Sequence, residues 1–384
     1  MMKKKKSHLE IIFTATIITS VCSQIDILSS IMRPIMYALW VLTLLIELFN
    51  TKGKLTITST TKKYSTMYVM FLFFCLLCSI KDDVYLESNY LRILLIPLLV
   101  VFFIDICPSS IVIDYQFYAK VFVLSAIFFA VYFHMQYITS YSYWLTARTY
   151  LFAQKNSAAQ IWMCAILLCW FIITPKRKAE KVFWYIVSLY LLFISGLSQC
   201  RTAILALGVG VIVLVLFRSK HKVRWICFFG VIILFVFLNP ATYQYINHAL
   251  LLERYADVDL NTFSSGRLDN YVKAINAFKS SPIIGNGVWY VDCSYLSILA
   301  ESGIVGFAII EPLWIYIIIR NFVSKFNVEN GSNMKNFTVV ITVFYLIESI
   351  FEGFPPFGPG VSALGFWLFT GLLMRYKKDS YTVV

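Results

Sequence analysis

Charged residues are scarce in this chain. Asp, Glu, Lys and Arg make up 14% of its 384 residues, whereas soluble domains carry about 25%. Apolar and aromatic residues make up 59%, which is more than a soluble core of this length needs. The length alone would suggest two or three soluble domains. The composition instead excludes a soluble enzyme, a secreted disulfide scaffold and a disordered chain, and it predicts an all-α polytopic membrane protein.

Motifs for nucleotide and metal chemistry are missing as well. The sequence has no Walker A loop and no dinucleotide fingerprint. Its four histidines do not cluster with Cys or Asp at the spacing of a metal site. Most of the nine cysteines lie in apolar runs, where they read as small packing residues rather than as a disulfide framework. We therefore expect no cofactor, no metal and no nucleic-acid partner.

What the sequence does contain is a series of twelve apolar runs. A bilayer-spanning helix needs about 17 to 25 residues, and twelve of them would use most of the apolar residues. We predict about twelve transmembrane helices in one transmembrane domain of residues 1–384. The runs lie at 9–26, 32–49, 65–80, 91–106, 117–138, 157–173, 182–197, 201–217, 223–238, 294–319, 337–350 and 361–374.

Basic residues are distributed unequally between the two sets of connecting loops. With twelve spans, 22 of the 33 Lys and Arg residues fall on the side that holds both termini, and ten fall on the opposite side. Cytoplasmic loops of membrane proteins are enriched in Lys and Arg. We therefore predict that both termini are cytoplasmic. The net charge of +13 is then an orientation signal.

The longest connection covers residues 239–293, between the predicted helices 9 and 10 on the outer side. Within it, apolar residues recur at helical spacing from Leu268 to Phe278. We predict an amphipathic helix near 266–280 that lies on the bundle or in the outer interface, with Ser264 or Ser265 as its N-cap. A loop of this size on a compact bundle is more often functional than a mere spacer.

Two arginines stand at the beginning of predicted helices on this outer side. Arg267 falls in the first turn of the amphipathic helix, and Arg201 begins an apolar span. A cation is electrostatically misplaced at a helix N-terminus, whereas a phosphate there would find both free N–H groups and a guanidinium. The alternatives are an Arg267 paired with Asp269 or another loop acid, and an Arg201 that reaches a lipid phosphate. Together the two arginines suggest a site for a pyrophosphate.

Acidic residues mark the segment that follows. Asp292 lies just before the span that starts near Ser294, and Glu301 lies inside that span. A carboxylate within the membrane is a functional candidate by default, and the alternative is a Glu301 hydrogen-bonded to neighbouring helices. Trp289 and Tyr290 fit an interfacial aromatic belt, although such rings can also stack on sugars.

Four short segments of the sequence have a recognisable pattern. They are FAQKNSAAQ, LSQCRTAILALGVG, SSGRLDNYVKAINAFKSSPIIGNG and YLSILAESGIVG. These segments resemble bacterial O-antigen polymerases of the Wzy type, within the O-antigen ligase/polymerase superfamily. The topology matches too, with a large periplasmic loop before the tenth helix. The resemblance implies a GT-C-like fold in the bacterial inner membrane and an active site on the periplasmic face.

The resemblance also implies an activity. It would be a metal-independent, inverting glycosyltransferase that joins undecaprenyl-pyrophosphate-linked repeat units, with membrane lipids, a chain-length regulator of the Wzz type and a flippase of the Wzx type as partners. By matching, Arg201 and Arg267 would bind the donor pyrophosphate. Asp292 stands where ligases of the superfamily carry a histidine, which favours a polymerase and makes Asp292 a candidate base.

The remaining expectations are less specific. Glu301 is a second candidate catalytic residue, and Asn156 is either a substrate contact or an N-cap. Three alternatives to a polymerase stay open. They are an O-antigen ligase that transfers polymer to lipid A-core, a flippase of lipid-linked oligosaccharides, and a structural or assembly subunit of a polysaccharide export complex. Further substrate contacts are expected at Arg148, Arg254 and Tyr295.

Overall fold

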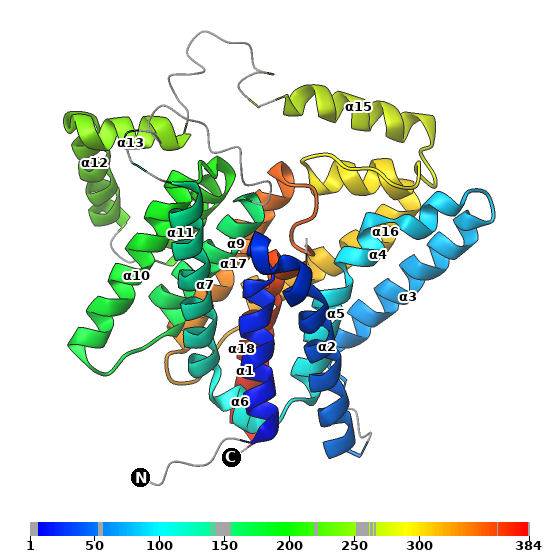
Figure 1. Ribbon diagram of the computed structural model, residues 1–384, viewed down its shortest axis with the longest axis horizontal. Coiled ribbons are helices and arrows are strands. Elements are labelled where there is room, and N and C mark those ends of the chain that lie inside the picture. The colour runs from blue at the N-terminus through cyan, green and yellow to red at the C-terminus, as the bar shows by residue number, and fades with distance from the viewer. Residues whose placement is uncertain are drawn as a thin grey trace.

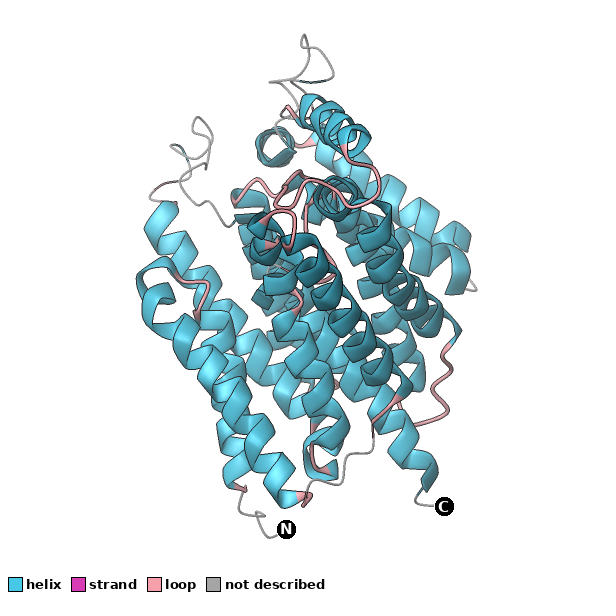
Figure 2. Ribbon diagram, turned by 90° about the vertical axis from the view of Figure 1, so that its right-hand side faces the viewer, coloured by secondary structure: helices cyan, strands magenta, loops and turns pink. Residues whose placement is uncertain are grey.

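The computed structural model consists of helices joined by loops, with no strand in the part of the chain that it describes (Figures 1 and 2). Seven helices are long and apolar enough to cross a membrane, and a bent pair of helices would make an eighth. These spans support a polytopic membrane protein. The count of twelve spans and the GT-C-like arrangement remain predictions. The described residues are 7–52, 57–138, 140, 142, 155–218, 222–250, 261, 264, 266–358 and 360–382.

Each of the twelve apolar runs lies on helical segments, but several of these segments are too short or too polar to pass as spans. Helix α1 (His8–Cys22) has 15 residues, fewer than the ~17 to 25 of a bilayer span, and α12 (Lys222–Leu238) has 17, at the lower limit. The helical segment Asp83–Ile93 is bent by 47° relative to Leu95–Ile106. The helices up to α7 are α1 (His8–Cys22), α2 (Asp26–Asn50), α3 (Ser59–Ser79), the 3-10 turn η1 (Asp83–Glu87), α4 (Asn89–Ile93), α5 (Leu95–Ile106), α6 (Ser109–Ile113) and α7 (Tyr115–Tyr137).

The remaining helices follow the same numbering. They are α9 (Lys155–Leu167), the π-helical turn η2 (Leu168–Ile172), α10 (Lys178–Leu197), α11 (Arg201–Arg218), α12 (Lys222–Leu238), α13 (Pro240–Leu250), α15 (Arg267–Ser280), α16 (Ser294–Val323), α17 (Gly331–Phe351), the 3-10 turn η4 (Gly360–Ala363) and α18 (Leu364–Thr382).

Burial separates inner helices from outer ones. The span Lys155–Ile172 is 72% buried and α17 is 67% buried, whereas α2 and α11 are 22% and 28% buried. The outer helices expose large apolar side chains such as Leu45, Leu205 and Ile212. An apolar outer surface is what a helix bundle in hydrocarbon presents. The inner helices therefore form the scaffold from which the polar site is built.

The two ends of the bundle carry different elements. Helix α1 begins and α18 ends at one end, and α13 and α15 lie at the other (Figures 1 and 2). Helices α10 and α11 meet on the α15 end, so Arg201 begins α11 there. Several functional candidates of the sequence analysis therefore lie at a single end of the molecule, opposite the helical ends nearest the two termini.

One span contains a break that its apolar pattern does not reveal. Gly303 interrupts α16 with φ +62° and ψ −164°, a conformation that only glycine adopts readily. The segment 294–319 is therefore not the single uninterrupted helix that the sequence predicts. The break lies two residues after Glu301, where the backbone around Ile283 and Gly285 packs against the helix.

Candidate functional site

An ion cluster joins three segments that are far apart in the sequence. The guanidinium of Arg267, in the first turn of α15, donates from Nε to Asp292 Oδ2 at 3.3 Å. It also donates from one terminal nitrogen to Glu352 Oε1 at 3.0 Å, directly after α17. The exposed fractions of the three side chains are 18%, 32% and 9%. Arg267 is thus paired with loop acids, but not with Asp269.

Asn156 extends this cluster to α9. Its side-chain amide donates to the same oxygen of Glu352 at 2.8 Å. One turn further into α17, the Gln160 amide donates to Glu348 Oε2 at 3.0 Å. Asn156 therefore serves as a partner of a buried carboxylate, and it connects the most buried span to the residue that pairs with Arg267.

Two tyrosines fix the position of Asp292. The Tyr290 hydroxyl donates to Asp292 Oδ1 at 2.8 Å. The Tyr271 hydroxyl donates to the carbonyl oxygen of Asp292 at 2.7 Å and to that of Ile350 at 3.1 Å. Both carboxylate oxygens of Asp292 are thereby engaged, and its backbone is tied to α15 and to the end of α17. The side chain is held in one place before any ligand binds.

Burial and charge act together on the titrating groups of the cluster. Burial alone would lower the pKa of Arg267, but the neighbouring carboxylates of Glu352 and Asp292 raise it above its ordinary value. Burial raises the pKa of Glu352 although Arg267 opposes this shift. Burial, assisted by nearby acids, raises the pKa of Tyr271 to about 12 and that of Tyr290 further. Arg267 therefore stays cationic and both phenols stay neutral.

A small cavity opens beside the cluster. It has a volume of about 170 Å³, and its walls come from α15 and from the loop before α16. An aromatic pair, Trp289 and Tyr290, lies on one side, and Asn270, Lys273 and Asp292 provide polar groups. Aromatic faces beside amide, ammonium and carboxylate groups suit a sugar ring and its hydroxyls.

The loop that carries Asp292 is anchored in the break of α16. The amides of Ile304 and Val305 donate to the carbonyls of Pro282 and Ile283 at 2.9 and 3.2 Å. The amides of Asn286 and Gly287 donate to the carbonyls of Ala300 and Glu301 at 3.0 and 2.9 Å. These four bonds replace the two helical bonds that Gly303 interrupts. A Cβ on Gly285 or Gly303 would collide with the opposing backbone.

Glu301 lies apart from the Arg267 cluster, and it connects α16 to the start of α4. Its carboxylate is 1% exposed and accepts a short hydrogen bond from the Ser88 hydroxyl, one from Asn89 Nδ2 at 3.3 Å and one from the Tyr90 amide at 3.4 Å. Asn89 also donates to the carbonyl of Trp289 at 3.2 Å. The structure places Glu301 as a partner of neighbouring segments, close to the loop that precedes Asp292.

Tyr295 and Arg201 stand at the edges of the cluster. The Tyr295 hydroxyl accepts from Ser349 at 3.0 Å, which ties the start of α16 to α17. Arg201 follows Cys200, whose thiol donates to the carbonyl of Lys155 at 3.2 Å, next to Asn156. Burial raises the pKa of this thiol to about 12, and the charges of Glu348 and Glu352 act in the same direction. Arg201 thus begins its helix on the side of the cluster where Asn156 donates to Glu352.

The N-terminus of α15 differs from its prediction. Gly266 occupies the N-cap position with φ +79°, in place of Ser264 or Ser265. The amide of Leu268 donates to Ser264 Oγ at 3.4 Å, and that of Asp269 donates to Asn261 Oδ1 at 3.1 Å. The expectation of free N–H groups for a phosphate is therefore wrong, because local side chains already accept from these amides. Of the two groups expected to bind a phosphate at this helix, only the guanidinium of Arg267 is left.

Three expectations are not tested by the structure. Arg148 and Arg254 lie outside the described residues. Within the described ranges, no three His, Cys, Asp or Glu side chains gather closely enough to hold a metal ion. Metal independence stays a prediction of the resemblance.

Two participants in the cluster were not singled out from the sequence. Glu352 was hidden in the Gly/Pro-rich turn EGFPPFGPG, although the four-residue spacing from Glu348 places two acids on one helical face. Tyr290 was interpreted as part of an aromatic belt, yet its hydroxyl is a direct partner of Asp292. An acid at the end of an apolar span is the signal that could have identified Glu352.

One segment of the chain matches a known protein family. Residues 186–293 match a family model described as "Wzy_C: O-Antigen ligase". The matched segment includes Arg201, Arg267 and Asp292, and it ends before Glu301 and Glu352. A search of curated proteins finds no match. The family match supports a relationship with the O-antigen ligase/polymerase superfamily and does not separate a polymerase from a ligase.

Proposed function

We propose that this protein is an O-antigen polymerase, a glycosyltransferase that joins undecaprenyl-pyrophosphate-linked repeat units at the periplasmic face of the inner membrane. The observation that carries the proposal is the Arg267–Asp292 pair beside a small aromatic and polar cavity, within a segment that matches the O-antigen ligase family model. The same pair supplies a cation for a phosphorylated leaving group and a carboxylate for a sugar hydroxyl.

Arg267 retains the capacity to bind an anion despite its two acidic partners. A guanidinium has five N–H donors, and the hydrogen bonds to Asp292 and Glu352 use two of them. Three remain for the donor pyrophosphate. Because the carboxylates already fix the guanidinium, little side-chain entropy is lost when the substrate binds. Arg201 and Lys273 add positive charge at the same end of the bundle.

The proposed reaction is a displacement at the reducing-end sugar of the donor. An acceptor hydroxyl forms a new bond to the anomeric carbon while the bond from that carbon to the pyrophosphate oxygen breaks. The hydroxyl proton passes to the carboxylate of Asp292, and undecaprenyl pyrophosphate leaves with the negative charge that Arg267 stabilises. A single displacement inverts the anomeric centre. Asn156 and Tyr295 act here as positioning residues, through Glu352 and α17.

A deletion strain distinguishes the polymerase from its alternatives. If the gene is deleted, lipopolysaccharide with a single repeat unit on core indicates a lost polymerase. Free core with accumulated lipid-linked polymer would instead indicate a lost ligase, and free core with cytoplasm-facing single units would indicate a lost flippase. Either of these two results would overturn the proposal.

Complementation of the same strain tests the residue roles. We expect Asp292→Ala, Arg267→Ala and Arg201→Ala to yield short or no polymer at normal expression. Lys279→Ala is the matched control, since Lys279 is an exposed cation in the last turn of the same helix. Wild-type chain lengths with Asp292→Ala would refute its role as base, and wild-type lengths with both arginine variants would refute the pyrophosphate site.

A further inference from the structure

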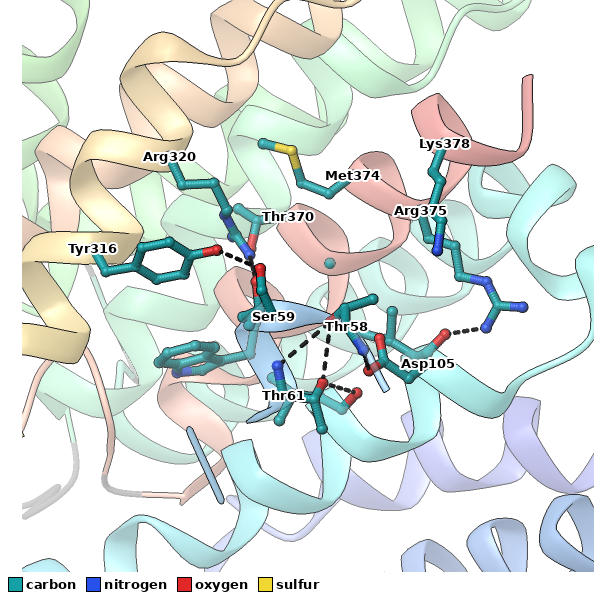
Figure 3. A pocket seen from close by; sticks show the side chains of 15 residues that line it. Thr58, Ser59, Thr61, Asp105, Tyr316, Arg320, Thr370, Met374, Arg375 and Lys378 are labelled. Carbon is teal, nitrogen blue, oxygen red and sulfur yellow. Dashed lines mark hydrogen bonds between the residues drawn. The ribbon is translucent and has the colours of Figure 1, made fainter. Parts of the chain in front are cut away.

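A second cavity lies at the opposite end of the bundle from Arg267. It has a volume of about 260 Å³ and lies between the start of α3, the end of α5, the second half of α16 and the end of α18 (Figure 3). Sites for drug-sized ligands have volumes of about 300–1,000 Å³. A cavity somewhat below this range is suited to an ion or a headgroup rather than to an oligosaccharide.

Cations dominate the charged lining of this cavity. Arg320 reaches it from α16, and Arg375 and Lys378 reach it from α18 (Figure 3). The single carboxylate in the lining belongs to Asp105, which accepts the backbone amide of Thr58 at 2.6 Å. That carboxylate is 7% exposed, so it fixes the turn before α3 instead of facing the cavity as a free anion. The lining therefore carries an excess of positive charge.

The partners of Arg320 are neutral. Its guanidinium donates to Thr60 Oγ1 at 3.0 Å and to Asn321 Oδ1 at 3.0 and 3.2 Å. Among the described residues, no carboxylate lies within 4.0 Å of its nitrogens. A cation on a membrane-spanning helix usually has a counter-charge or access to a headgroup. Arg320 thus has capacity for an anionic ligand.

Hydroxyl groups complete the lining. Thr58 to Thr61 form the turn at the start of α3, and the Ser59 hydroxyl lies 3.0 Å from that of Tyr316. Apolar side chains such as Val101 and Met374 form the rest of the wall. Hydroxyl and guanidinium donors match the oxygens of a phosphate, whereas the apolar wall suits the glycerol and first methylenes attached to it.

We propose that this cavity binds the phosphate of an anionic phospholipid. It lies at the end where α1 begins and α18 ends, which the distribution of Lys and Arg predicts to be cytoplasmic. Basic pockets between helices on that side bind anionic headgroups. The bound lipid would hold α3, α16 and α18 together, at a distance from the glycosyl-transfer site and independently of its chemistry.

Native mass spectrometry of the full-length protein tests this site. The protein would be released from nanodiscs that contain phosphatidylglycerol or phosphatidylcholine, and retained lipid would be counted. We expect retained phosphatidylglycerol to fall about three- to tenfold in Arg320→Gln and in Lys378→Gln, and phosphatidylcholine to be weakly retained throughout. Lys178→Gln, an exposed cation at the start of α10, is the matched control. Lys378 is exposed, so its variant is informative even if Arg320→Gln lowers stability.

Two results would overturn the proposal. Equal retention of phosphatidylglycerol by the wild type and both cavity variants would show that the cavity is not its site. Binding of inorganic phosphate in detergent, abolished by the same variants and unaffected by added phosphatidylglycerol, would assign the cavity to a soluble phosphate and refute the lipid source.

Discussion

A terminal guanidinium nitrogen of Arg267 lies 3.0 Å from Glu352 Oε1, although the two residues are 85 positions apart in the sequence. The pair connects the surface helix α15 to the end of α17, one of the most buried spans. Because α15 lies at the surface, this contact decides where Arg267 lies relative to the bundle. The first predictions concern this pair.

Arg267 and Glu352 should be energetically coupled. Removing one partner leaves the other partly buried without its counter-charge, which costs about 1–3 kcal/mol. We expect the double variant Arg267→Ala/Glu352→Ala to be less destabilised than the sum of the single variants, by about 0.5–3 kcal/mol. Thermal unfolding in detergent provides the measurement. Strict additivity of the two substitutions would contradict the pairing.

Anion binding at the cluster should depend on pH through Glu352. Burial raises its pKa, so on acidification Glu352 takes up its proton earlier than a free glutamate does. The neutral side chain leaves Asp292 as the remaining counter-charge of Arg267, and affinity for a doubly esterified pyrophosphate should rise as pH falls through that pKa. We expect a rise of about tenfold, or ~1.4 kcal/mol.

Calorimetric titration between about pH 5 and 8 with a polyprenyl-pyrophosphate sugar would measure this effect. Such a diester carries no proton that titrates in this range, so the change belongs to the protein. Glu352→Gln is the control, because its side chain is neutral at every pH and should bind with a constant affinity. A pH dependence that persists in this variant would assign the effect to another group.

Gly303→Ala should destabilise the protein strongly. An alanine at φ +62° and ψ −164° is strained by about 1–3 kcal/mol, and its Cβ would also meet the backbone of Ile283. Gly208→Ala is the matched control, because nothing lies within 4 Å of a Cβ at this exposed position in α11. There the helix should gain up to ~1 kcal/mol. Equal unfolding temperatures for both variants would rule out the break.

Glu301 should position the neighbouring residues Ser88 to Tyr90 rather than accept a proton in the reaction. Glu301→Gln keeps an oxygen that can accept from Ser88 and from the Tyr90 amide, so polymer should form at near wild-type length. Glu301→Ala loses these contacts and should lower polymer yield at least about tenfold, by analogy with misplaced supporting groups. Glu87→Gln, an exposed neighbour, is the control. If the glutamine variant is as inactive as the alanine variant, the carboxylate itself takes part in the reaction.

Structural features that depend on one helix or one run of residues can be predicted from the sequence. The spacing from Leu268 to Phe278 depends on local periodicity, and the helix is observed at Arg267–Ser280. Arg267 and Asp292 could be singled out because charge is rare and expensive near a membrane. Their contact, and the role of Glu352 between them, could not be predicted, because they depend on how α15 and α17 pack. The break at Gly303 depends on a loop 20 residues earlier, which no local pattern records.

Hydrogen bonds between the 282–287 loop and the break in α16 divide residues 282–292 into two parts. The two parts differ in how far their side chains can be substituted. The backbone of residues 282–287 makes the hydrogen bonds that a helical turn would make. Most side chains of this loop can therefore vary without a change in these backbone contacts. The residues from Trp289 to Asp292 follow this loop and line the cavity. Substitutions at Trp289 or Val291 can therefore change the shape of the cavity, while Asp292 and the helices beneath it keep their positions.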